Sequence, residues 1–238
     1  MRCDPEPRRG CCSATTSGST PALLLEAVLA EAVRHGVRVA RASVASVRTR
    51  PTGAVVDTDR GRVTARDVVL AAGVWTPSLV ASLGAPLPVL PAKGHSVTVT
   101  SPEVALTGPL LLLDQRLAVT QLAAGLRITG GYQLTSPRDR GIDPRRTADL
   151  VRRADLELRL APGTQPAREW SGLRPATPDG VPAIGRLATA PAVVVATGHG
   201  MLGSSAGPGT GELVAEILDG RRTPDAFSPD RFHRPAAR

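Results

Sequence analysis

The segment AVVVATGHGMLGSSAGPGTGELVAEIL, residues 192–218, decides the fold. Residues 192–196 are a continuous apolar run that ends at Thr197, which is typical of a strand buried on both faces in a parallel sheet. Glycines follow at positions 198, 200 and 203, and the spacing then predicts a helix from about Pro208 to Leu218 that ends at Gly220. A strand that enters a helix through a glycine-rich loop indicates an α/β protein.

Residues 198–203 also have the literal spacing G-x-G-x-x-G of a dinucleotide-binding loop, and Asp219 lies near the expected position of its ribose-binding acid. A βαβ unit needs a second strand after the helix, whereas Gly220 is followed by a polar stretch. The context therefore disfavours an ADP-binding fingerprint. The remaining interpretation is a loop whose free backbone N–H groups, with the positive end of the helix, face an electron-rich ligand group.

Outward from this segment, the run 67–72 ends at Gly73 and predicts a second strand buried on both faces, followed by a helix from about Thr76 to Ser82. Nearer the N-terminus, Thr20 caps a predicted helix that ends at Gly36. Its apolar face comprises Leu25, Val28, Leu29, Ala32 and Val33. A strand is expected over residues 37–40, and β-prone runs at 44–48, 54–58 and 62–65 predict a three-stranded meander.

The middle of the chain has a different pattern. Between Gly94 and Tyr132, alternating or apolar runs occur without long helices between them, which indicates an antiparallel sheet. These runs cover residues 96–100, 110–113, 117–121 and 126–130. Helical spacing then extends from about Arg145 to Leu160.

Composition bears on the core and on nucleic-acid binding. The 238 residues are 42% hydrophobic and only 2% aromatic, so the core must consist mainly of Ala, Val, Leu and Ile. The formal charge is +8, but the basic residues are scattered among acids, and Lys93 is the only lysine. A nucleic-acid binder clusters its cations among stacking aromatics, so no nucleic-acid partner is expected.

Cysteine usage and hydropathy bear on location. Cys3, Cys11 and Cys12 all lie in a polar, aperiodic stretch, residues 1–20, that is interpreted as a disordered or foreign tail. Their spacing indicates neither a disulfide framework nor a metal site. No apolar run reaches the length of a bilayer span, so no transmembrane segment is expected. The predicted location is the cytoplasm, with peripheral contact to the inner membrane left open.

Several motifs carry a family resemblance. In chain order they are VVLAAGVW at 68–75, PAKG at 91–94, WSGLRP at 170–175, TPDGVPAIG at 177–185, ATGHGMLG at 196–203 and GPGTG at 207–211. Together they resemble the FAD-dependent oxidoreductases that include D-amino acid dehydrogenase, D-amino acid oxidase, glycine oxidase and sarcosine oxidase. The D-amino acid dehydrogenase branch fits best, and the similarity runs from about residue 20 to about residue 233.

The resemblance implies a fold and a reaction. The fold is α/β, with a partial FAD-binding domain, Rossmann-like and of the glutathione-reductase type, and an inserted antiparallel-sheet substrate domain. Residues 21–91 and 169–221 would form the FAD-binding part, residues 92–168 the substrate-binding part, and residues 222–238 a C-terminal tail. In such enzymes hydride passes from the Cα of a small amino acid to flavin N5, and the resulting imine hydrolyses.

The resemblance also implies site residues. Arg174 would bind the substrate carboxylate with its planar guanidinium, the alternative being a surface arginine at a strand end. Tyr132 is a second substrate-binding candidate, the alternative being a tyrosine buried beside a local partner. The cofactor-binding candidates are Val44, Ala72, Gly73, Gly198, His199, Gly200, Met201, Leu202 and Gly203. His199 could instead satisfy loop carbonyls. No catalytic side chain and no metal ligand are expected.

One departure from the family limits these expectations. Its members open with a βαβ unit whose glycine fingerprint holds the FAD pyrophosphate, and no such unit precedes Thr20. The chain therefore looks like the latter part of such an enzyme, and the expectation is a missing nucleotide-binding segment or separate chain. A non-catalytic remnant, a partner-dependent subunit and a basic binding module remain alternatives.

Overall fold

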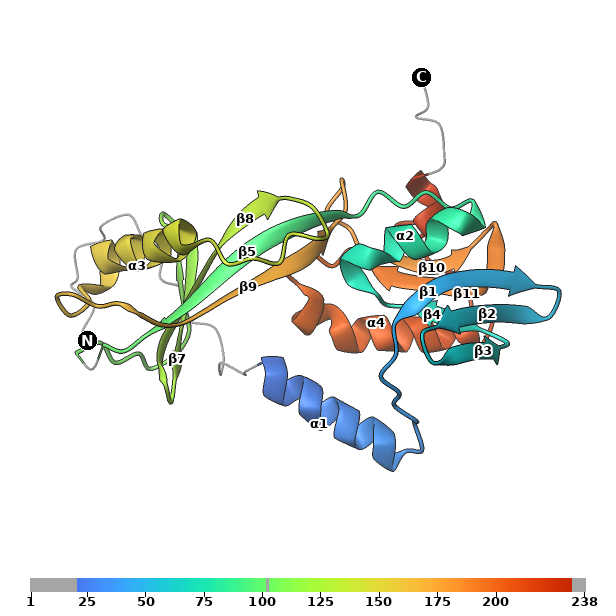
Figure 1. Cartoon of the computed structure of the whole chain (residues 1–238), viewed down its shortest axis with the longest axis horizontal. Helices are drawn as coiled ribbons and strands as arrows, with labels where there is room; N and C mark the ends of the chain where they lie inside the picture. Colours follow the sequence, from blue (N-terminus) through green and yellow to red (C-terminus); the bar gives the residue numbers. More distant parts are fainter. Residues whose placement is uncertain (1–20, 102, 233–238) are drawn as a thin grey trace, which may run out of the picture. The chain divides into compact units, whose positions relative to one another are not determined.

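The computed structural model describes residues 21–101 and 103–232 (Figure 1), and these divide into two units. Of the described residues, unit 1 contains 21–30, 93–134 and 138–173, apart from residue 102. Unit 2 contains residues 31–92, 135–137 and 174–232. The model has the mixed α/β composition expected from the sequence.

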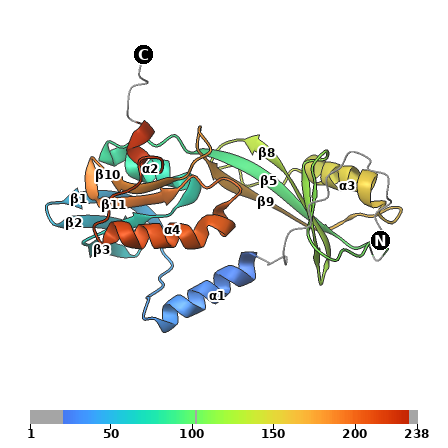
Figure 2. The ribbon, with the colours of Figure 1, turned by 180° about the vertical axis from the view of Figure 1, so that it is seen from behind.

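Unit 2 is built on a three-stranded sheet of β10 (Ala183–Leu187), β11 (Ala190–Thr197) and β4 (Val68–Leu70), in that order. β11 pairs antiparallel with β10 and parallel with β4. Alternate residues of β11 point to opposite faces. Val194 packs toward α4 (Gly203–Leu218), whereas Val193 and Val195 join a second apolar cluster on the other face. Figure 2 shows α4 along this sheet.

The second cluster brings in the remaining elements of unit 2. The meander consists of β1 (Val44–Arg50), β2 (Gly53–Thr58) and β3 (Gly61–Ala65), which confirms its prediction. α2 (Thr76–Val80) lies between the 3-10 turns η1 (Gly73–Trp75) and η2 (Ala81–Leu83), and η3 (Pro229–Phe232) comes last. Val47 of β1 and Val80 of α2 are fully buried in this cluster.

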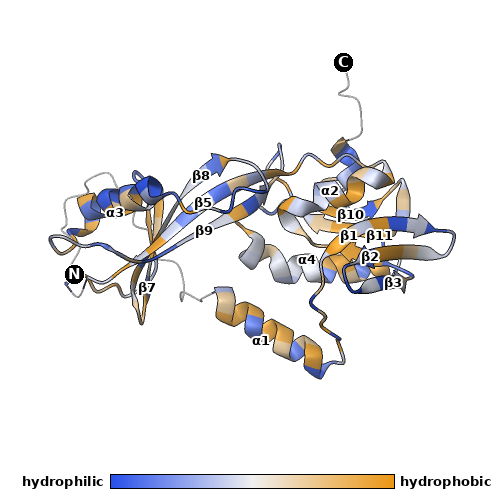
Figure 3. Ribbon diagram, viewed as in Figure 1, coloured by the Kyte–Doolittle hydropathy of each residue, from blue (hydrophilic) through white to orange (hydrophobic). Residues whose placement is uncertain are grey.

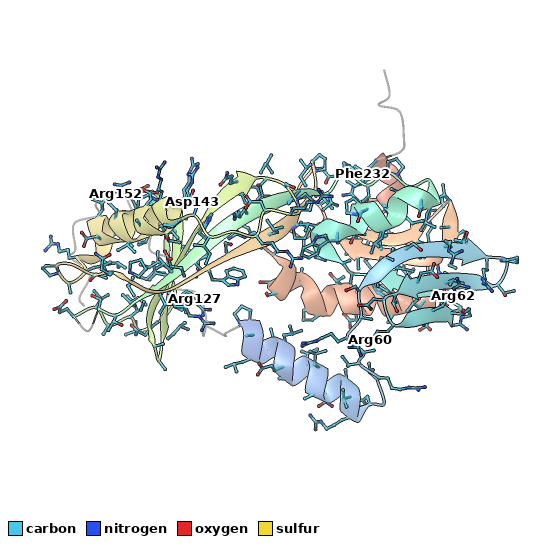
Figure 4. All side chains as sticks on the ribbon, viewed as in Figure 1. Arg60, Arg62, Arg127, Asp143, Arg152 and Phe232 are labelled. Carbon is cyan, nitrogen blue, oxygen red and sulfur yellow. The ribbon has the colours of Figure 1, made fainter. Side chains whose placement is uncertain are left out.

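Unit 1 contains most of a five-stranded sheet, and its five strands follow the order β6-β7-β8-β5-β9. Their bounds are β5 Leu90–Val99, β6 Leu110–Leu112, β7 Leu117–Leu122, β8 Gly125–Leu134 and β9 Pro166–Ala176. α3 (Pro144–Leu158) covers one face of the sheet, and Leu150 and Ala154 of α3 pack on Val97 and Ile128. Asp143, labelled in Figure 4, caps α3 by accepting a hydrogen bond from Arg145 N.

α1 (Pro21–Arg34) has no buried residue. Figure 3 shows the ribbon of α1 largely in the hydrophobic colour. Leu25, Val28 and Val33, which belong to the predicted apolar face, are each more than half exposed at 58%, 56% and 53%. Among the described residues, this apolar face therefore has no cover. Its predicted cap, Thr20, lies outside the described residues.

Three local predictions were wrong. Residues 37–40 are not a strand, because no described strand pairs with them and Val37 and Val39 are exposed. β4 is not buried on both faces, because it has one neighbour in the described sheet and Val69 is 39% exposed. α4 begins at Gly203, so Pro208 lies inside the helix, where its ring costs one backbone hydrogen bond on an exposed stretch.

Candidate functional site

Two glycine loops meet where the parallel strands of unit 2 end. Because β4 and β11 run in the same direction, their carboxyl ends lie at one edge of the sheet, which is where α/β proteins bind ligands. Gly73 follows β4 and Gly198 follows β11, with φ values of 55° and 85°. The buried Thr197 hydroxyl donates to Gly73 O at 3.0 Å, which fastens one loop to the other.

The loop 198–203 is also fastened to the end of β9. Gly200 N donates to Pro175 O at 2.8 Å, and Ala176 forms an isolated antiparallel bridge with His199. Leu202 N closes the loop by donating to His199 O at 2.9 Å. These bonds place the backbone of Arg174, the residue before Pro175, beside the glycine loop within the same unit.

The glycines have different reasons to lack a side chain. A Cβ on Gly198 would lie 2.6 Å from Thr177 Cγ2, so the neighbouring side chain leaves no room for any residue but glycine. A Cβ on Gly73 or Gly200 would meet no atom within 4 Å. The second pair therefore borders open space where the plane of a flavin ring can approach the main chain, and these positions fit the FAD that the motif implies.

Backbone donors point out of this loop at the start of α4. The first N–H groups of a helix have no partner inside it, and those at the start of α4 follow two exposed residues, Met201 and Leu202. No side chain caps the helix at Leu202. An electron-rich group at this end would gain these hydrogen bonds and the favourable helix dipole.

His199 is held by the helix that follows it. Its Nε2 lies 2.8 Å from Thr210 Oγ1 in the second turn of α4. Burial lowers the pKa of His199 below the usual histidine value of 6.5, so the imidazole is neutral at neutral pH. A neutral imidazole brings no positive charge to the loop, so the role that remains for His199 is hydrogen bonding and packing.

The predicted site residues are thus partly brought together. Arg174, Ala72, Gly73 and the loop 198–203 belong to one unit and are linked by the bonds above. Val44 begins β1 in the meander and is 43% exposed. Tyr132 lies on β8 in unit 1 and is 52% exposed, so it is not the buried tyrosine of the alternative interpretation.

Three threonines join the site without having been singled out. Thr197 donates a hydrogen bond to Gly73 O, and Thr177 packs against Gly198. Thr210 lies within hydrogen-bonding distance of His199. Thr177 and Thr197 are ordinary β-branched residues near strand ends, and Thr210 lies eleven positions from its partner. Only the fold brings these partners together, so no spacing rule could have found them.

Unit 1 contains a separate buried polar cluster on β5. Lys93 Nζ donates to Asp139 Oδ1 at 2.6 Å, and the Lys93 side chain is only 5% exposed. His95, two positions along, is 3% exposed, and its Nε2 has no hydrogen-bond partner among the described atoms. Burial, and secondly the Lys93 charge, lower the pKa of His95.

Comparison with known proteins assigns the family. The model of the family described as FAD dependent oxidoreductase matches residues 2–217. The chain belongs to this family of FAD-dependent oxidoreductases. Within it, a D-amino acid dehydrogenase of Cereibacter sphaeroides is 35% identical over 222 residues, 86% of this chain and 48% of the relative. One of Rhizobium johnstonii is 35% identical over 82% of this chain and 47% of its own length.

Solved structures agree with the family and its fold. Glycine oxidase from Geobacillus kaustophilus aligns with a TM-score of 0.71 and 29% identity, covering 80% of this chain and 52% of that one. L-proline dehydrogenase from P. horikoshii aligns with a TM-score of 0.78 at 21% identity, which shows the shared fold. The chain spans about half the length of the curated FAD-dependent oxidoreductases that it matches.

Neither a membrane-spanning helix nor a metal site occurs among the described residues. In the part of the chain that the structure describes, no helix is both long and apolar enough to cross a bilayer. Nor do the described residues contain a group of three or more His, Cys, Asp or Glu side chains that could hold a metal ion. The three cysteines lie outside the described residues.

Proposed function

We propose that this chain supplies the flavin-facing loop and the carboxylate clamp of an FAD-dependent oxidoreductase that oxidises the C–N bond of a small D-amino acid. The observation that carries the proposal is the 2.8 Å hydrogen bond from Gly200 N to Pro175 O. It holds the glycine loop beside the backbone of Arg174 at the carboxyl edge of parallel strands. One ligand group can be bound by loop N–H groups and another by the guanidinium.

Each part of the site has a role in this proposal. FAD held at the glycine loop would supply the two-electron acceptor for oxidation of the substrate C–N bond, taking up the hydride from Cα. The backbone N–H groups and the positive dipole end at the start of α4 would face the electron-rich edge of the flavin and favour negative charge there. Arg174 orients the substrate by its carboxylate, and Tyr132 is proposed as a second substrate contact.

The proposal extends to the organisation of the chain. Residues 21–91 and 169–221 are assigned to FAD binding, with the main chain of Val44 near the adenine and Ala72 and Gly73 beside the pyrophosphate and ribityl chain. Residues 92–168 are assigned to the substrate. Residues 1–20 and 222–238 are proposed as tails. We place the enzyme in the cytoplasm. Cell fractionation would distinguish this location from peripheral contact with the inner membrane.

A nucleotide-binding segment or chain completes the proposed enzyme. Support comes from the coverage of the curated relatives, about half of whose length this chain spans. It also comes from the apolar α1, which is uncovered among the described residues, and from β4, which has one neighbour in the described sheet. Both features are surfaces that another segment can cover.

Absorbance spectroscopy tests the proposal in two steps. The purified chain alone should be colourless, and the chain supplied with a nucleotide-binding segment should retain FAD after desalting. The flavin should then lose its absorbance near 450 nm under anaerobic D-alanine. Stoichiometric FAD on the chain alone would contradict the need for a second segment. A flavinated protein that no D-amino acid reduces would contradict the oxidoreductase.

A further inference from the structure

The C-terminal segment 222–232, the described part of the proposed tail, packs along the edge strand of the sheet in unit 2. In the described sheet β10 has one neighbour, β11. Ile184 N of β10 donates to Phe227 O at 2.8 Å. A Cβ on Gly185 would lie 2.9 Å from Pro229 Cδ, so the segment and the strand are in close contact. The segment therefore covers β10 as part of the folded unit.

Arg231 of this segment binds the loop that precedes β10 with every nitrogen of its guanidinium. Nε and Nη2 donate to the two carboxylate oxygens of Asp179 at 2.8 and 3.1 Å. Nη2 also donates to Val181 O at 2.7 Å, and Nη1 donates to Pro182 O at 3.4 Å. A bond from Nη1 to Ser228 O at 3.0 Å ties Arg231 to its own segment. Each N–H of the guanidinium thus has an acceptor, and an ammonium has too few donors to replace it.

The ion pair of Arg231 and Asp179 is charged at neutral pH and partly shielded from water. The Arg231 side chain is 16% exposed, and its Cζ lies 4.1 Å from the ring centroid of Phe232, which is labelled in Figure 4. The hydrogen bonds from Arg231 are the main cause that lowers the pKa of Asp179 to about 2. The attachment of the loop to the C-terminal segment therefore persists throughout the neutral range of pH.

The loop that Arg231 binds also confines Gly198. Val181 O, which accepts from Arg231, accepts from Thr177 Oγ1 as well, at 2.8 Å. A Cβ on Gly198 would lie 2.6 Å from Thr177 Cγ2 and 3.5 Å from Pro182 Cα. Both ends of the loop thus lie against the first glycine of the segment that leads into α4. A shift of either end changes the space in which the chain turns at Gly198.

We propose that Arg231 is a positioning residue for the flavin-facing loop 198–203. This inference rests on the proposed function, which gives that loop its ligand. Arg231 fixes a loop that confines Gly198, and the direction of the chain at Gly198 sets where the following N–H groups point. Without the guanidinium, the fixed loop keeps its own turn bond from Gly180 N to Thr177 O but loses its attachment to the C-terminal segment. The glycine loop should then open more often while the sheet stays intact.

Arg186 offers a matched control at the opposite edge of the same sheet. Its Nη1 donates to Asp67 Oδ1 at 2.6 Å and to Pro191 O at 2.7 Å, and its Nη2 donates to Ile217 O at 3.3 Å. Asp67 and Pro191 lie at the amino ends of the parallel strands β4 and β11. Both arginines thus join a carboxylate to backbone carbonyls within unit 2, but Arg231 does so at the carboxyl edge, where the glycine loops lie.

Amide hydrogen exchange in the full chain, without FAD, tests the role of Arg231. Arg231→Met should speed exchange at Gly200 and Leu202, whose N–H groups are hydrogen-bonded, by about tenfold, the scale of one charge-assisted hydrogen bond. Arg186→Met removes a similar network from the same unit and should leave these two amides within about twofold of their original rates. Arg231→Lys should give an intermediate rate, because it keeps the charge but not the fork. Urea unfolding measures the global stability of each variant.

Asp179→Asn tests the same contact from the loop side. It keeps an acceptor for Val181 N, which donates to Asp179 Oδ1 at 3.1 Å, but removes the charge that Arg231 binds. It should speed exchange at Gly200 less than Arg231→Met does. It also keeps the test decisive if Arg231→Met does not fold.

Three results would overturn the positioning role. They are an equal acceleration of the loop amides by Arg186→Met, an even rise in exchange across unit 2 after Arg231→Met, and loop amides that neither Arg231→Met nor Asp179→Asn changes. In the flavinated protein, Arg231→Met should also weaken FAD retention by a larger factor than Arg186→Met does.

The exchange experiment and flavin reduction fail independently. If Arg231→Met loosens the loop but no D-amino acid reduces the flavin of the original protein, the inference holds and the oxidoreductase falls. If D-amino acids reduce the flavin and Arg231→Met leaves both the loop amides and FAD retention unchanged, the proposed function holds and the inference falls.

Discussion

Arg174 is the residue whose proposed role depends most directly on its own chemistry. A guanidinium presents two parallel N–H donors to a carboxylate, whereas an ammonium keeps the charge but loses the two-point geometry. In the flavinated protein, Arg174→Lys should lower kcat/KM for a D-amino acid by about ten to a few hundredfold, since a charge-assisted hydrogen bond is worth roughly 1.5–3 kcal/mol. FAD affinity should stay nearly unchanged.

Amines without a carboxylate provide the control for this substitution. Their oxidation, if measurable, should be insensitive to Arg174→Lys because they have no group for the clamp to hold. Arg174→Ala should lower kcat/KM for the amino acid further. If FAD is lost from Arg174→Lys while kcat/KM per bound flavin is unchanged, Arg174 is a structural or cofactor residue.

At the scale of the element, the loop 198–203 offers a matched pair of glycines. Gly198 and Gly200 both have a positive φ, 85° and 54°, but only Gly198 has neighbours within reach of a Cβ. Gly200→Ala should therefore cost about 1 kcal/mol of unfolding free energy, the usual strain of a left-handed alanine. Gly198→Ala should cost roughly 2–4 kcal/mol, because its Cβ also collides with Thr177.

Urea unfolding followed by circular dichroism measures both variants. Similar losses in the two would mean that the contact between Gly198 and Thr177 yields easily, and the loop would then be less constrained than its hydrogen bonds suggest. Flavin binding adds a second comparison, since a Cβ on Gly200 enters the open space proposed for the ring. Gly200→Ala should weaken FAD binding despite its smaller effect on stability.

Elements with a strong local pattern could be predicted from the sequence, and those that depend on distant partners could not. The meander, α3 and β11 follow from alternation, helical spacing and an apolar run. Residues 37–40 carry the same β-prone pattern but find no partner strand among the described residues. Pro208 misled the prediction of α4, because a proline usually marks the start of a helix.

The candidate site shows the same limit. Motifs could identify the glycine loop and Arg174, because each is a short run of adjacent residues. The bond from Thr197 to Gly73 spans 124 positions, and the ion pair of Lys93 and Asp139 spans 46. Only the pairing of β4 with β11 and the packing of unit 1 bring such partners together, and no local pattern encodes them.

At the scale of the whole molecule, each unit has its own apolar core and its own histidine with a lowered pKa. His95 lies in unit 1 and His199 in unit 2, and burial lowers the pKa of both. Around His95, Lys93 and Arg146 lower the pKa further, whereas Asp139 and Asp143 raise it. Each histidine takes up its proton near pH 6.5 when unfolded and at lower pH when folded, so stability should fall as pH drops below about 6.5.

Because the two cores are separate, we expect each histidine to change the pH dependence of the stability of its own unit only. Trp170 lies in unit 1 and Trp75 in unit 2, so Trp75→Phe and Trp170→Phe chains each report the unfolding of one unit. His95→Gln should reduce the pH dependence of the unfolding free energy that Trp170 reports between pH 7 and 5, by up to about 1.4 kcal/mol per pH unit. The pH dependence that Trp75 reports should stay unchanged. His199→Gln should do the reverse. Urea titrations across this range measure both, and an equal change at the two tryptophans after either substitution would show that the units unfold as one.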